Sequence, residues 1–163
     1  MLGNIKRFFE KSITGRKISS GVTSEKVTEE GLKLATAALL IEITRADRHV
    51  KEEERDVVIR ALRKSFDLTE SEVDELIILA EEEVKEATSL FQFTHLIDKG
   101  FSYEKKKEVI RHLWQVALSD DETEKHEVHL IRKVAELLHV SHSDFIAGKQ
   151  EARKLRAQEL QDL

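Results

Sequence analysis

Hydrophobic positions along most of the chain recur every three or four residues, which is the spacing of amphipathic helices. From residue 28 to residue 46, apolar side chains occupy nearly every side of the predicted helix. A helix of this kind is normally central and covered by others. Further helical stripes, one of which places Trp114 in the core, are predicted over about 51–65, 69–87, 89–100, 102–118, 125–138 and from 141 onward. The pattern predicts a single all-α bundle of about seven helices.

A helix–turn–helix design occurs twice in this pattern, once around Asp47 and again around Asp120. In each copy an apolar helix ends at the aspartate, a short polar turn follows, and a second helix begins with acidic residues. Aligning the two aspartates also aligns Glu54 with Glu127, so each copy carries Asp-x6-Glu across its joint. An approximate repeat of this kind predicts two helical pairs that pack as pseudo-equivalent halves.

The four acidic residues of these joints are the candidate metal ligands. Asp47 stands at the C-terminal edge of a helix, where the helix dipole disfavours a carboxylate. Two carboxylates about 6 Å apart repel by roughly 3 kcal/mol at an effective dielectric constant near 20, and a hard divalent cation would offset that repulsion. The structural alternative is that Glu54 and Glu127 simply stabilise helix N-termini, where acidic residues are favourable without any ligand. The candidate site therefore consists of Asp47, Glu54, Asp120 and Glu127, with a divalent metal ion as its cofactor.

The N-terminal region differs from the rest of the chain in charge and pattern. Residues 1–17 hold five basic residues and one acidic residue, a charge of +4, whereas the whole chain carries −5 and the remainder therefore −9. Within residues 2–13, hereafter the arm, apolar residues share one face of a short helix. A helix so short is marginal in water and is expected to dock on the body, on a partner or on a membrane surface.

A Gly/Ser/Thr-rich linker follows the arm, so residues 1–27 are predicted to be arm plus flexible linker and residues 28–163 the helical domain. Because few contacts should cross such a linker, the arm is expected to be dispensable for folding. At the other end, the last helix becomes almost wholly polar beyond Leu155, and its end is expected to fray.

Composition excludes several classes of protein. The absence of cysteine excludes disulfides, thiolate metal sites and cysteine nucleophiles, and it is consistent with a reducing cytoplasm. No apolar run reaches the roughly 20 residues of a membrane-spanning helix. A net negative charge argues against nucleic acid as a ligand. We therefore expect a cytoplasmic protein, with peripheral membrane contact through residues 2–13 as the one membrane interaction to test.

Other motifs for catalysis or metal binding are incomplete. Glu136-x-x-His139 matches half of a di-iron bundle signature, which requires a second copy and further glutamates. Counted from Asp120, an EF-hand would need glycine where Lys125 stands and glutamate where Ile131 stands. Neither a G-x-S-x-G motif nor a glycine-rich phosphate loop occurs. The histidines are interpreted as scattered surface residues, and a metal-dependent enzyme is the least favoured of the functions considered.

The stretch ALLIEITRADRHVKEEERDVVIRALRKSFDLTESEV and its echo VALSDDETEKHEVHLIRKVAELLHVSHSDF resemble the TerB-like (tellurite-resistance) domains of bacteria. The resemblance covers about residues 28–148. It implies an all-helical, non-enzymatic domain that binds divalent cations and acts with protein partners in stress responses or envelope-associated complexes. A pure interaction scaffold without metal is the alternative function.

The family's joint reads alanine-aspartate-glycine, then two or three variable residues, then an acidic helix start with a fixed glutamate. The four candidate ligands fall on the acidic positions of that motif, in both copies. Arg48 and Asp121 stand where the family has glycine. This departure is expected to alter the turn at each joint.

Overall fold

The computed structural model describes residues 2–14, 28–46, 52–86, 92–118 and 121–161, and every regular element in these ranges is helical. In chain order the elements are α1 (Leu2–Phe8), the π-helix η1 (Phe9–Thr14), α2 (Glu29–Ala46), α3 (Glu52–Phe66), α4 (Glu70–Glu86), α5 (Gln92–Gly100), α6 (Tyr103–Ala117), α7 (Asp121–Leu137) and α8 (His142–Gln161). The all-α prediction is confirmed, and α2–α8 are the seven helices expected of the body within the described ranges.

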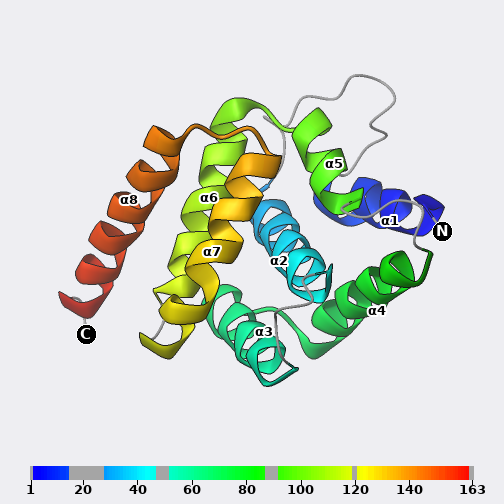
Figure 1. The fold of residues 1–163 in the computed structure, drawn as a ribbon, viewed down its shortest axis with the longest axis horizontal. Helices are drawn as coiled ribbons and strands as arrows, with labels where there is room; N and C mark the ends of the chain where they lie inside the picture. The colour runs from blue at the N-terminus through cyan, green and yellow to red at the C-terminus, as the bar shows by residue number, and fades with distance from the viewer. Residues whose placement is uncertain (1, 15–27, 47–51, 87–91, 119–120, 162–163) are drawn as a thin grey trace.

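Helix α2 lies at the centre of the bundle (Figure 1). It contacts η1 and each of the helices α3–α7. Its residues from Leu32 to Thr44 are buried, except for the half-buried Lys33. Because nearly every side of α2 is apolar, each of its faces is covered by another apolar element. The prediction of a central helix is confirmed.

The two predicted helical pairs are α2–α3 and α6–α7. Helix α2 contacts α6, and α3 contacts α7, so the two pairs pack against each other. Both α2 and α6 run toward the lower end of the bundle in Figure 1, so their C-terminal ends lie at the same end of the molecule. The joints differ in length, because residues 47–51 separate α2 from α3 whereas residues 118–120 separate α6 from α7.

Helix starts follow the polar signals in the sequence. The Glu72 N–H donates to Thr69 Oγ1 (3.1 Å) and the Thr69 N–H donates to Glu72 Oε1 (2.9 Å), which completes the predicted capping box of α4. Ser102 caps α6. Ser141 Oγ accepts the Asp144 N–H (3.2 Å) at the start of α8. These local hydrogen bonds satisfy backbone donors that have no partner inside a helix.

The arm packs on the body as part of one core. Ile5, Phe8, Phe9 and Ile13 are at most 8 % exposed. Helix α1 contacts α4 and α5, while η1 contacts α2. Burial of a large apolar side chain stabilises a fold by roughly 1.5–3 kcal/mol, so these four residues offset part of the entropy that is lost when the arm is ordered. The expectation that few contacts join the arm to the body is therefore wrong, although the domain division at residue 28 stays a prediction.

Helix α8 lies along α6 at the opposite side of the molecule from the arm (Figure 1). A Cβ placed on Gly148 would lie 3.3 Å from Ile110 Cγ2 and 3.3 Å from Trp114 Cδ1, so glycine allows the two helices to approach closely. Trp114 is buried as predicted. Every described residue after Ala152 is exposed.

Candidate functional site

The predicted metal ligands fall largely outside the described residues. Asp47 and Asp120 lie in ranges that the structure does not describe, and so do the side chains of Glu54 and Glu127. The backbone of Glu54 lies in the first turn of α3, as predicted. Helix α7 starts earlier than predicted, at Asp121, so Glu127 lies in its second turn, about 9 Å along the axis. The two joints are therefore not equivalent in their helix boundaries.

A buried carboxylate near the arm escaped the sequence interpretation. Glu42 lies in the middle of α2 and is 2 % exposed. Its carboxylate accepts hydrogen bonds from the Phe93 N–H (2.8 Å), the Thr94 N–H (3.1 Å) and the Thr94 hydroxyl (2.6 Å). Glu42 thus caps the start of α5 from a neighbouring helix, where a negative charge also suits the helix dipole. An acidic residue inside an otherwise apolar helical stripe is the signal that could have identified it.

A second buried polar group is His112, which corrects the expectation that the histidines are surface residues. Its ring is 2 % exposed and packs edge-on against Phe66 at 5.6 Å between ring centroids. Nδ1 lies 2.7 Å from the Glu108 carbonyl oxygen, and Nε2 lies 2.8 Å from Glu29 Oε1. The Glu108 carbonyl oxygen and the Glu29 carboxylate are both acceptors, so the ring contacts them through its N–H groups. This contact ties the start of α2 to α6.

The contact with His112 changes the pKa of the Glu29 carboxyl group. Partial burial raises its pKa, but the hydrogen bond from His112 and the nearby charges of His112, Arg111 and Lys33 outweigh that effect. The pKa of Glu29 therefore lies below its ordinary value. The Glu29 side chain is half exposed, so solvent screening limits what the pair contributes to stability.

His139 does not form half of a di-iron site. It follows the end of α7 with a left-handed backbone (φ 61°). The Val140 N–H reaches the Ala135 carbonyl and the His139 N–H reaches the Glu136 carbonyl, which is a Schellman cap without the usual glycine. Its Nδ1 lies 3.1 Å from Asp98 Oδ1. Glu136 and His139 therefore belong to the C-terminal cap of α7. The ligands of a di-iron bundle would both lie within a regular helix and project from one of its faces.

Asp98 is the centre of an ion-pair cluster that joins α5 to α6 and to the α7–α8 turn. Lys106 Nζ lies 2.7 Å from Asp98 Oδ1, the oxygen that also faces His139. Partial burial raises the pKa of Asp98, but the hydrogen bonds from Lys106 and His139 bring it below its ordinary value. Because the Asp98 carboxylate is already paired with the Lys106 ammonium group, we interpret this cluster as one that holds the helices together.

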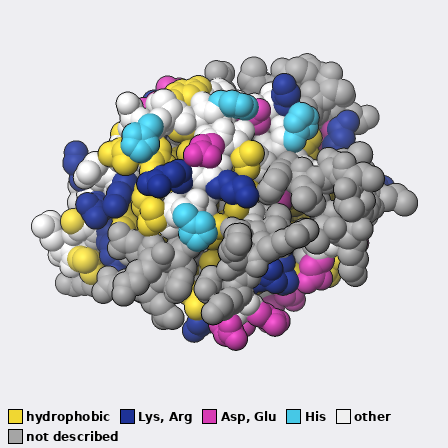
Figure 2. Space-filling view, viewed as in Figure 1, with side chains coloured by type: hydrophobic (Ala, Val, Ile, Leu, Met, Phe, Trp, Pro, Cys, Tyr) yellow, Lys and Arg dark blue, Asp and Glu magenta, His cyan; other side chains and the backbone are white. Residues whose placement is uncertain are grey.

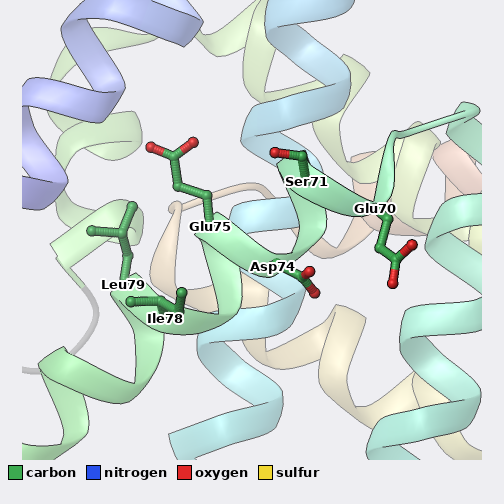
Figure 3. A pocket seen from close by; sticks show the side chains of 6 residues that line it. All are labelled: Glu70, Ser71, Asp74, Glu75, Ile78 and Leu79. Atoms are coloured by element: carbon green, nitrogen blue, oxygen red, sulfur yellow. The ribbon is translucent and has the colours of Figure 1, made fainter.

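A hollow of about 740 Å³ lies along the outer face of α4. Figure 3 shows its lining side chains, all from this helix. The Glu75 carboxylate points away from those of Glu70 and Asp74, so the three do not converge. Divalent cations require several oxygen ligands that converge on one point. This arrangement does not provide them.

Figure 2 shows how the histidines and the acidic side chains of the described residues are distributed over one face of the molecule. Histidines on this face stand apart from one another, and acidic side chains gather along the lower edge, over α3. Among the described ranges, no group of three or more His, Cys, Asp or Glu residues could hold a metal ion. Nor is any helix in the described part of the chain long and apolar enough to cross a membrane.

Comparison with known proteins identifies the family. A family model described as tellurite resistance protein TerB matches residues 33–150. The matched range includes all four candidate ligands and both helical pairs apart from the first turn of α2, and it leaves the arm and the exposed half of α8 outside. No curated protein and no solved structure matches the chain. Because the family model covers well over half of the sequence, the chain belongs to the TerB family.

Proposed function

We propose that this protein is a non-enzymatic TerB-type binding module that holds a divalent cation at its acidic joints. It works in the cytoplasm with a protein partner, in a stress-response or envelope-associated complex. The observation that carries the proposal is the twofold occurrence of Asp-x6-Glu, in a chain whose two helical pairs pack together and whose helices α2 and α6 both end at the same end of the bundle. Carboxylate oxygens, which all four of these residues carry, are the donors that hard divalent cations prefer.

The α2–α3 joint is the stronger candidate of the two. Five residues separate its helices, and Glu54 lies in the first turn of α3, so Asp47 and Glu54 flank one short connection. In the α6–α7 joint, Glu127 lies a full turn deeper in its helix. We therefore assign the main cation site to Asp47 and Glu54, with Asp120 and Glu127 as a weaker second site.

Thermal unfolding with and without cations tests this proposal. A cation that binds the folded state alone stabilises it by about 2.7 kcal/mol at a hundredfold excess over Kd. For a domain of this size, each kcal/mol raises Tm by roughly 2–4 °C. Millimolar Ca²⁺, Mg²⁺, Mn²⁺ or Zn²⁺ should therefore raise Tm by about 5–10 °C relative to chelated protein, if Kd is near 10 μM.

Charge-matched variants separate binding at the joints from binding elsewhere. Asp47→Asn should abolish most of the gain in Tm, and Asp120→Asn a smaller part. Asp74→Asn makes the same charge change on the exposed face of α4 and should leave the gain intact. If none of the four ions raises Tm, the acidic joints are structural, and the interaction scaffold without metal becomes the function.

A further inference from the structure

The arm lies in a groove of the body, between α2, α4 and α5. Phe8 meets Phe93 edge to face, with 6.1 Å between ring centroids. Phe9 lies 6.0 Å from Phe101 and is fully buried. Phe93 lies near the start of α5, and Phe101 directly follows its end, so the two phenylalanines of the arm lie along the length of that helix. Aromatic contacts of this geometry stabilise by about 0.5–1.5 kcal/mol beyond the area that they bury.

The groove is built by the TerB domain, whereas the segment that fills it is not. Helices α2, α4 and α5 form its walls. Glu42 of α2 holds the start of α5, so two of these walls are joined without the arm. The residues that form the groove lie within the family match at 33–150, and the arm precedes that match. The receptor surface is therefore a property of the domain, and the arm is an addition to it.

The arm also shows which helix fits the groove. Its buried residues are Ile5, Phe8, Phe9 and Ile13, a spacing of i, i+3, i+4 and i+8. Amphipathic helices that bind in grooves use anchors at this type of spacing. The outer face of the arm is basic, because Lys6, Arg7 and Lys11 are exposed.

The neighbouring wall has the opposite charge. Helix α4 contains eight acidic residues and one lysine, and it contacts α1. Asn4 Nδ2 of the arm donates to Glu82 Oε2 of α4 at 3.4 Å. Complementary charge of this kind favours and orients a basic helix over an acidic one.

We propose that the groove formed by α2, α4 and α5 is a helix-binding surface of the domain. The arm is its tethered ligand, and a basic amphipathic helix of a partner protein replaces the arm. The arm then protects an apolar groove until the partner is present. This surface is separate from the acidic joints, so the proposal holds whether or not they bind a cation.

A nicked full-length chain tests whether the arm behaves as a ligand. A protease recognition sequence is inserted between Ser20 and Gly21, and the protein is cut after it has folded. The probe is a fluorescent peptide of residues 1–14. We expect the nicked protein to keep its helical circular-dichroism signal, release its arm on dilution and bind the probe saturably. A probe with Phe8→Ala and Phe9→Ala should bind at least tenfold more weakly.

A disulfide lock supplies the matched control, because the chain contains no cysteine of its own. Asn4→Cys with Glu82→Cys places thiols on the arm and on α4, at two side chains whose ends are in contact. A direct disulfide requires Cβ atoms about 3.5–4.5 Å apart, so a reducible bis-methanethiosulfonate spacer bridges the two thiols, and the bridged molecule is called the oxidised form. When oxidised, the nicked double variant should exclude the probe, and reduction should restore binding. An inert control lock is not needed, since each molecule is compared with itself in two redox states.

Three results would overturn the proposal. Loss of helical signal on nicking would mean that the body does not stay folded once the arm is released. Equal probe binding by the oxidised and reduced forms would place the probe outside the groove. The third result is that the uncut, reduced double variant binds anionic vesicles and the oxidised form does not. The released arm would then bind a lipid surface and not a protein partner.

Discussion

The arm and helix α8 stand at opposite sides of the molecule, and they differ in how much of themselves they bury. The arm places four large apolar residues in the core from little more than a dozen positions. Helix α8 has 20 residues, yet its buried members are Phe145, Gly148 and Ala152. The short element is thus the better integrated one. Length and helical propensity therefore do not indicate how much an element contributes to the core.

The difference comes from what each element finds opposite it. The arm meets an open groove with aromatic residues at both ends of α5, so bulky side chains gain most by burial there. Helix α8 meets α6 at a close approach, where glycine and alanine are needed and large residues would collide. Beyond Ala152 its side chains are exposed, and a hollow lies between this end of α8 and the end of α3.

The largest effect is expected from Phe9→Ala. Truncating a fully buried phenylalanine costs about 3–5 kcal/mol through lost apolar contacts and the cavity that remains. Tm should fall by roughly 6–20 °C, measured by circular dichroism. The control is Lys11→Ala on the exposed side of the arm, which should change Tm little. Equal stability of the two variants would mean that the arm is not part of the core.

A smaller loss of stability is expected from Glu42→Ala, which removes the carboxylate that holds the start of α5, one of the helices on which the arm packs. The change leaves the Phe93 and Thr94 N–H groups without their carboxylate, at a cost of about 1–3 kcal/mol. Hydrogen exchange should increase most in α5 and in the arm above it. Glu42→Gln keeps an oxygen acceptor and should recover part of the stability. Exchange that rises uniformly over all helices would contradict this local role.

At the other end of the comparison, the start of α8 should respond to pH through Asp144. The Tyr103 hydroxyl donates to Asp144 Oδ2 (2.5 Å) and, together with the Ser141 hydroxyl, holds the pKa of Asp144 below its ordinary value. A carboxyl group whose pKa is lowered by folding stabilises the folded state at pH values above its ordinary pKa. This stabilisation is lost as the pH falls through the pKa of the folded state.

Tyr103→Phe should therefore move the titration of Asp144 to higher pH, toward the ordinary value. Carboxyl carbon shifts in NMR spectra would measure this, with the exposed Glu151 as the internal reference. An unchanged titration of Asp144 would show that Ser141 alone sets its pKa.

The smallest effect is expected from removing residues 157–163. The described part of this segment is exposed along its whole length, so the free energy of unfolding should change by less than about 0.5 kcal/mol. Urea unfolding of the truncated and full-length chains would measure the difference. A loss comparable to that of Phe9→Ala would show that the end of α8 packs on another surface and contributes to stability as the arm does.

Much of this architecture could be predicted from local pattern. The apolar positions of α2 are so continuous that a central, covered helix was the physically reasonable expectation, and Thr69 with Glu72 marked a helix start through hydrogen bonds between near neighbours. The joints were visible as a repeated spacing. What they hold stays a prediction, since the side chains of the candidate ligands lie outside the described residues.

The sequence by itself determined the helices, their caps, the central place of α2 and the repeated pairs, because these follow from periodicity and from hydrogen bonds within a few residues. Tertiary structure alone decided three other matters: that Glu42 caps α5, that His112 is buried against Glu29, and that the arm belongs to the core. Each depends on groups more than 50 residues apart in the chain or on a groove assembled from several helices. A local pattern carries no information about which distant residue will supply the partner, so only the folded chain determines it.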